Sequence, residues 1–202
     1  DLTPNANEEA HAAGPFNGTA SAVDGGGAIT HNLFIYDYTI TDGVELKASY
    51  NPSGLAASVE GSTEYGIKYT GIDGLTVYAA MGENNDAAAG VDNVNFAAIY
   101  TAGAMSVGFQ TNDVDHATAN SDRDSTMIGI SYAVSDDLSV SLNTSTVEHE
   151  SSTLDDQEAT GVSFSYTSGG MTVSGTYGSM DNVGGTGTVD NNAYELNVAF
   201  AF

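Results

Sequence analysis

The feature that most constrains this chain is a period-two alternation of apolar and polar residues that recurs along its length. From Tyr194 to Phe202 every second residue is apolar, and polar or small residues lie between them. The same pattern occurs in "VELKASY" (44–50) and "TEYGIKY" (63–69). Since successive side chains of a β-strand point to opposite faces, each such stretch predicts a strand with one apolar and one polar face. The chain is therefore predicted to be all-β.

The connections between these stretches alternate strictly between short and long. Short connections are rich in Gly and Asp, as in tight hairpin turns: Thr41–Gly43, Ile72–Gly74, Thr101–Gly103, Ser135–Asp137 and Ser168–Gly170. Long connections are polar and acidic: Asn51–Ser62, Gly82–Val91, Asn112–Ser125, Glu148–Gln157 and Ser179–Asn191. Measured from turn to turn, the unit recurs every 29 to 34 residues. This hairpin repeat predicts eleven antiparallel strands in an up-and-down order.

Aromatic residues recur at one level of the repeat. A tyrosine lies three to five residues before the last residue of each short turn, at Tyr38, Tyr69, Tyr100, Tyr132 and Tyr166. Phe202 ends the last strand at the same level. A bilayer interface favours such a ring of aromatic residues. Inside a bilayer every backbone polar group needs a partner, so the sheet must close into a barrel. Bacterial single-chain barrels have an even number of strands, and eleven predicts that further strands lie upstream.

Composition narrows the classes of function. Among the 202 residues, 27 Asp and Glu against three Lys and Arg give a net charge of −24. This charge argues against nucleic acid as a partner, because phosphates are bound by basic residues. No cysteine is present, which excludes disulfides and thiolate chemistry. No acid–base pair, phosphate-binding loop or Ser/His/Asp arrangement stands out, so the chain is predicted not to be an enzyme.

The hairpin repeat, the acidic loops and the terminal "AYELNVAFAF" (193–202) together resemble the C-terminal part of a Gram-negative outer-membrane general porin. The resemblance is to the trimeric, 16-stranded type of alphaproteobacteria. It implies a transmembrane antiparallel up-and-down β-barrel, of which the eleven strands are the last of sixteen. It also implies passive diffusion of small hydrophilic solutes and ions, a homotrimer in outer-membrane lipid, and no required cofactor. In that family the barrel-assembly machinery reads the terminal aromatic residue, here Phe202.

The same resemblance suggests how the chain is divided. Residues 30–202 are expected to form barrel strands. Residues 1–29 are expected to be a loop segment, at the place where the family's inward-folded constriction loop ends. Its acids then become candidate constriction residues, and a solvated loop is the alternative: Asp1, Glu8, Glu9 and Asp24.

The sequence contains only three basic residues. Lys47 and Lys68 fall on the polar phase of neighbouring hairpins, beside Glu45 and Glu64. A lipid-facing cation at the bilayer midplane costs about 2–4 kcal/mol, so these four residues are predicted to line the pore. Local ion pairing among them is the alternative. Arg123 is predicted to lie in a loop, paired with Asp122 or Asp124.

The excess of acids predicts a preference for cations, because an acidic mouth raises their local concentration. The acidic loops also offer carboxylate oxygens for loosely bound divalent cations such as calcium, although none has the spacing of a calcium-binding motif. Two further alternatives stay open. One is a narrower, substrate-specific channel of about twelve strands, and the other is a soluble acidic β-sandwich at the cell surface.

Overall fold

The computed structural model describes residues 34–52, 61–84 and 90–201, and these form one antiparallel sheet of eleven strands in sequential order. The strands are β1 (Phe34–Thr41), β2 (Val44–Asn51), β3 (Ser62–Ile72), β4 (Leu75–Asn84), β5 (Val91–Ala102), β6 (Met105–His116), β7 (Arg123–Ala133), β8 (Leu138–His149), β9 (Gln157–Ser168), β10 (Met171–Asp181) and β11 (Asn191–Phe200). A short 3-10 helix, η2 (Val183–Gly185), precedes β11. Within the described ranges no helix has the length and apolarity needed to cross a bilayer.

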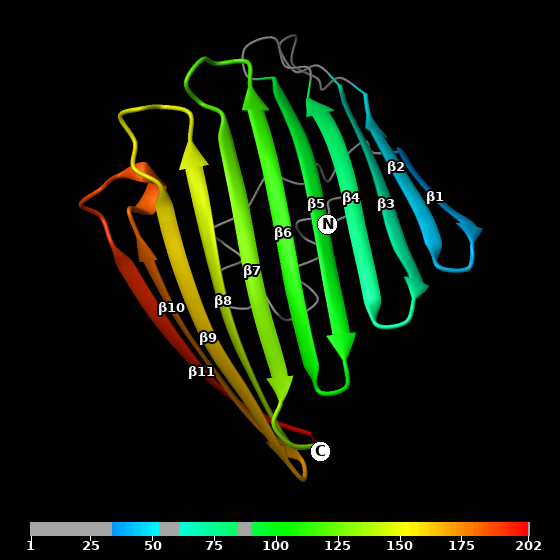
Figure 1. The fold of residues 1–202 in the computed structure, drawn as a ribbon, viewed down its shortest axis with the longest axis vertical. Helices are drawn as coiled ribbons and strands as arrows, with labels where there is room; N and C mark the ends of the chain where they lie inside the picture. Colours follow the sequence, from blue (N-terminus) through cyan, green and yellow to red (C-terminus); the bar gives the residue numbers. More distant parts are fainter. Residues whose placement is uncertain (1–33, 53–60, 85–89, 202) are drawn as a thin grey trace.

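The sheet is a single curved wall, open between β1 and β11, with the short turns at one end and the described long connections at the other (Figure 1). The predictions of eleven strands and of an up-and-down order are confirmed. The β-sandwich alternative is wrong for the described residues, because they form one sheet rather than two packed sheets. Phe202 and residues 1–29 lie outside the described residues.

The short turns require glycine where the backbone enters the left-handed region. Gly74, between β3 and β4, has φ +75°, and a Cβ on this residue would lie 2.2 Å from the carbonyl oxygen of Thr101. An L side chain is disfavoured by the dihedral and blocked by the neighbouring hairpin. The tyrosines predicted to be level do lie next to these turns, as the pairing of Tyr100 with Leu75 and of Tyr132 with Met105 shows.

The two faces of the sheet have opposite characters. In β5, Phe96 is 40% exposed whereas Asn95 is 3% exposed. The same alternation runs through β6 to β9, where apolar side chains are exposed outward. The polar side chains buried between them are Gln110, Asn112, Ser125, Ser141, Asn143, Ser145 and Ser163. We call the apolar phase the outer face and the polar phase the inner face. A water-soluble sheet would bury the apolar phase, so this sheet is built for an apolar medium outside.

Several strands extend further toward the long connections than predicted. The stretch Asn112–Ser125 was expected to be a loop, but β6 continues to His116 and β7 begins at Arg123. Placing Arg123 in a loop was therefore wrong. The reason is that the apolar–polar pattern changes there: outward positions become acidic, as at Asp113, while the inward Val114 is only 1% exposed. A prediction that recognises strands by apolar residues at outward positions therefore misses such strand ends.

The last long connection is tied to its neighbour. The backbone N–H of Gly184 donates to Oε1 of Gln157 at 2.8 Å, and that of Asp155 donates to the carbonyl of Gly185 at 2.9 Å. The segment with η2 therefore rests against the β8–β9 connection, at the long-loop end of the wall (Figure 1).

Candidate functional site

The predicted pore-lining residues lie together on the inner face of β2 and β3. Glu45 pairs across the strands with Lys68, and Lys47 lies opposite Gly66. Glu64 lies opposite Ser49, whose hydroxyl donates a hydrogen bond of 2.9 Å to Oε2 of Glu64. All four therefore share the polar phase, as the alternation predicts.

Contacts on this part of the wall are also compatible with the alternative prediction, in which the charged side chains pair locally. The ammonium group of Lys68 lies 5.4 Å from the ring centroid of Tyr78 on β4, within the range of a cation–π interaction. Lys47 lies opposite Asp37 of β1 in the strand register. The two lysines thus have anionic or aromatic neighbours and also lie on the inner face, so local pairing and a charged wall are compatible.

A belt of carboxylates occupies the outer face at the long-loop end, and we call it the outer acidic rim. Its members share the outward phase and are all exposed: Glu83, Asp92, Asp113, Asp115, Asp124, Glu148, Glu158 and Asp181. Many lie directly opposite one another in the register, as Asp124 does with both Asp113 and Glu148. Like charges in directly opposed positions destabilise a sheet, so this arrangement has an energetic cost.

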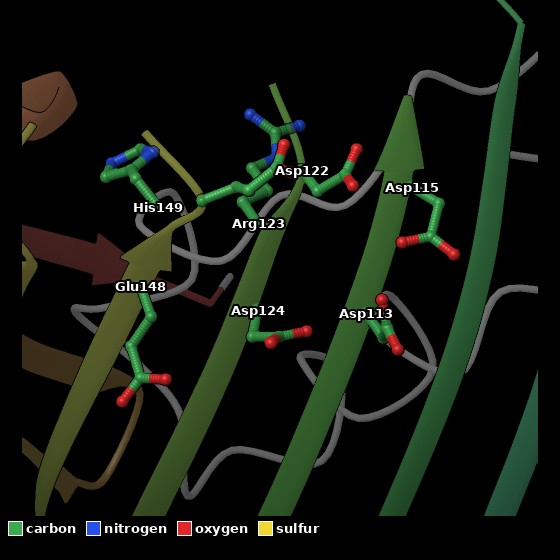
Figure 2. Close-up of a pocket in the computed structure, with 8 residues that line it drawn as sticks. Asp113, Asp115, Asp122, Arg123, Asp124, Glu148 and His149 are labelled. Carbon is green, nitrogen blue, oxygen red and sulfur yellow. The ribbon is translucent and has the colours of Figure 1, made fainter. Parts of the chain in front are cut away.

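Figure 2 shows the middle of this rim, where Asp113, Asp124 and Glu148 lie side by side on β6, β7 and β8. A cavity of about 370 Å³ is lined here by Asp113, Asp115, Asp122, Arg123, Asp124, Glu148, His149 and Glu150. Asp113 lies on the part of β6 beyond the apolar band. Partial desolvation and the Asp124 carboxylate raise the pKa of Asp113 above its ordinary value. The rim therefore holds a carboxyl group that gains a proton more readily than an isolated one.

In the part of the chain that the structure describes, no group of three or more His, Asp or Glu side chains is placed to hold a metal ion. Calcium at the acidic loops thus stays a prediction. The four predicted constriction acids, Asp1, Glu8, Glu9 and Asp24, lie outside the described residues, and their role also stays a prediction.

Comparison with known proteins identifies the family. A model of the Gram-negative porin family matches residues 2–156. The chain belongs to the Gram-negative porin family. The resemblance predicted from the hairpin repeat is confirmed, and membership places the porin in the bacterial outer membrane. No curated protein sequence matches the chain.

Solved porin structures share the fold at low sequence identity. The anion-selective porin from Comamonas acidovorans matches with a TM-score of 0.69 and 14% identity, over 84% of this chain and 59% of that one. The trimer form of OmpT from Vibrio cholerae matches with a TM-score of 0.63 and 18% identity, over 83% and 64%. A triple mutant of the Rhodopseudomonas blastica porin gives 0.59 and 20%, over 84% and 55%. The chain thus spans less than two thirds of these porins.

Sequence reasoning missed the outer acidic rim because it assigned most of these acids to the long connections and did not follow the strand phase back to Asp92 and Glu158, which directly follow two of those connections. The available signal was phase: Asp92, Asp124 and Glu158 each lie eight residues before a tyrosine of the aromatic level, and an even spacing keeps them on the same face as that tyrosine. Following the phase beyond the apolar run would have placed these acids on the outer face of strands.

Proposed function

We propose that this porin forms the wall of a water-filled channel through which small hydrophilic solutes and ions diffuse passively across the outer membrane. The observation that carries the proposal is the inversion of the two faces, with apolar side chains exposed outside and polar side chains inside. A barrel wall between lipid and water requires this distribution. The proposal includes no chemical step.

Closure of the wall is part of the proposal. In the bilayer the free edges of β1 and β11 need hydrogen-bonding partners, because unpaired strand edges are not tolerated in hydrocarbon. A complete barrel of sixteen strands would supply them, and the partial coverage of related porins supports that number. A twelve-stranded, substrate-specific barrel is the competing proposal. Counting the strands in a structure of the full-length protein separates the two.

A cation preference is the finer part of the proposal, and the outer acidic rim supports it. Its carboxylates attract cations to the mouth within about one Debye length, roughly 10 Å at 0.1 M salt. Glu45, Lys47, Glu64 and Lys68 are proposed to line the channel below. The selectivity of the Comamonas porin is not transferred to this chain, since 14% identity supports only the shared fold.

The test is electrical. Full-length protein in a planar bilayer should give stable ion-conducting steps, and a salt gradient should give a reversal potential that favours K⁺ over Cl⁻. The preference should weaken as the salt concentration rises. Absence of conducting steps would refute the channel, whereas conducting steps with a Cl⁻ preference at low salt would refute only the cation preference.

Assembly is proposed to follow the family as well. We propose a homotrimer, supported by the trimer form of a similar structure, and predict one heat-sensitive trimer band on unheated gels.

We also propose Phe202 as the residue that the assembly machinery reads. Deleting Phe202 should reduce insertion into the outer membrane much more than it reduces folding into detergent. Equal insertion of the shortened and the complete chain would contradict that role.

A further inference from the structure

The connection between β10 and β11 is held against its neighbour at several points. We call this connection, residues 182–190 with η2, the strap. Three hydrogen bonds join the strap to the β8–β9 connection and to the start of β9. Two of them involve Gly184 and Gly185, and in the third Nδ2 of Asn182 donates to the carbonyl of Asp156 at 2.8 Å. We call this arrangement the seated position of the strap.

One residue of the strap is packed closely against the ring of a histidine. Gly185 is buried and has φ +76°. A Cβ on this residue would lie 2.8 Å from Cβ of Leu154, 3.0 Å from Cδ2 of His149 and 3.1 Å from Nε2 of His149. The imidazole ring of His149 therefore lies directly against the backbone of Gly185. The seated position depends on a residue without a side chain at 185 and on this ring beside it.

The ring of His149 has one nitrogen without a hydrogen bond in the seated position. Nε2 is buried and makes no hydrogen bond to the described residues. Buried polar atoms are nearly always hydrogen-bonded, and an unpaired one has an energetic cost. A neutral imidazole leaves one uncharged nitrogen unpaired there. An imidazolium has an N–H on both nitrogens and would bury a charged donor without an acceptor, which costs more. The seated position therefore favours the neutral ring.

The same side chain also borders an acidic space. His149 helps to line the 370 Å³ cavity in the outer acidic rim, and Figure 2 shows its ring directed away from Asp113 and Asp124. Residues 183–185 of the strap have no titratable side chain. The charged groups around His149 are Glu148 and Glu150 on its own segment, Asp122 and Arg123, which line the same cavity, and Asp155, which bonds Gly185. Carboxylates outnumber the one guanidinium, so a protonated ring that turns toward the cavity gains opposite charge.

We propose that the strap is a proton-operated latch, which neutral His149 keeps seated and protonation of His149 releases. Histidine is the side chain whose charge changes between about pH 5 and 8. On protonation the ring turns from Gly185 to the carboxylates of the cavity, and the strap loses the surface on which it rests. The inference goes beyond the proposed channel, since it concerns a movement of the wall itself. The strap lies at the long-loop end, so its release would change the mouth of such a channel.

The test measures the position of the strap in the full-length protein, folded in detergent and free of other cysteines. Nitroxide labels on Thr188→Cys in the strap and Ser168→Cys at the far end of β9 report one distance by electron paramagnetic resonance. At pH 7.5 the distribution of distances should have a single narrow peak. At pH 5 the fraction of molecules in that peak should fall at least twofold, and it should return when the pH is raised again.

Substitutions separate the latch from a general effect of acid. His149→Gln is neutral at both pH values and should keep the strap seated at both. His149→Lys is charged at both and should release it at both. Gly185→Ala places a Cβ against Leu154 and the ring, and should also release the strap at both. His116→Gln is the matched control, because His116 ends β6, two strands away from β8, and this variant should respond to pH as wild type does.

Two outcomes would overturn the latch. One is a wild-type distance distribution that is the same at pH 7.5 and pH 5. The other is a loss of the narrow peak at pH 5 that is as large in His149→Gln as in wild type. If His149→Gln does not fold, His149→Asn takes its place, and the wild-type comparison can still refute the proposal. None of these outcomes depends on ion conduction, so failure of the latch and failure of the proposed channel are distinguishable.

Discussion

The outer and inner faces of β5 to β9 are made by alternate residues of the same strands, and they differ in two ways. The first difference is apolarity: Phe96, Phe109 and Phe164 are each 40% exposed on the outer face, whereas Asn95 and Gln110 on the inner face are 3% and 0% exposed. The second is charge, since the carboxylates lie on the outer face and only beyond the apolar band. The position of a residue in the alternation therefore decides whether its side chain faces lipid or water. For an outward residue, the height along the strand decides whether it lies at the acyl chains or at the headgroups.

The sharpest test of this comparison introduces the same charge on each face at the same height. Val162 is an outward residue midway between Tyr166 and Glu158, and Thr176 is an inward residue of the neighbouring strand. We expect Val162→Lys to destabilise the folded barrel by about 2–4 kcal/mol, the cost of a lysine at the bilayer midplane.

Thr176→Lys is the matched control and should cost less than about 1 kcal/mol, because its ammonium group reaches water on the inner side. Reversible unfolding by urea in lipid vesicles, followed by circular dichroism, gives both values. Equal losses for the two variants would contradict the assignment of the faces.

The outer acidic rim provides a smaller effect. Asp124→Asn removes the charge that opposes both Asp113 and Glu148, and each relieved cross-strand pair is worth about 0.2–1 kcal/mol. We expect the variant to be more stable than wild type by about 1 kcal/mol at pH 7. Thermal unfolding in detergent, followed by circular dichroism, measures this difference.

The rim also predicts the sign of a pH dependence. The pKa of Asp113 is raised in the folded state, so the folded protein binds this proton more strongly than the unfolded chain does. The contribution of Asp113 to stability therefore increases as the pH falls from neutral through the raised pKa, and is complete below the ordinary pKa. Asp124→Asn should reduce this gain. Asp73→Asn, in a short turn, is the control. If the gain in stability at low pH were equal in Asp124→Asn and wild type, the rim would not be the source of this pH dependence.

The smallest effect concerns the charged part of the inner face. Replacing Lys47 and Lys68 with Gln removes two inward positive charges and should strengthen the K⁺ preference. The change in permeability ratio should be less than about twofold, or roughly 0.4 kcal/mol, because Glu45 and Glu64 remain in place and salt screens the wall. Reversal potentials at 0.1 M and 1 M salt measure it. An unchanged K⁺ preference in the double variant at 0.1 M salt would show that the lysines do not face the channel.

The sequence was sufficient to predict the wall, because the strand period of two and the turn glycines are local properties. The inner phase of Lys47 and Lys68 followed from the same period. The extent of β6 and β7 did not follow, because Asp113 and Asp124 replace apolar residues at outward positions and remove the local signal. The cross-strand opposition of these two acids depends on register, which the sequence pattern alone does not fix at the long-loop ends.

The constant distance between the tyrosine level and the outer acidic rim has a consequence for the host membrane. Tyr100, Tyr132 and Tyr166 each follow an outward acid, at Asp92, Asp124 and Glu158, by eight residues. Eight residues of strand span about 26 Å, which a tilt near 40° reduces to about 20 Å of height. Aromatic rings favour one headgroup layer, and carboxylates are excluded from the acyl chains. The protein therefore carries a fixed hydrophobic thickness and matches a thin bilayer. In a thicker one, hydrophobic mismatch would force the lipids around the barrel to compress, which favours sorting of this protein into thin membranes.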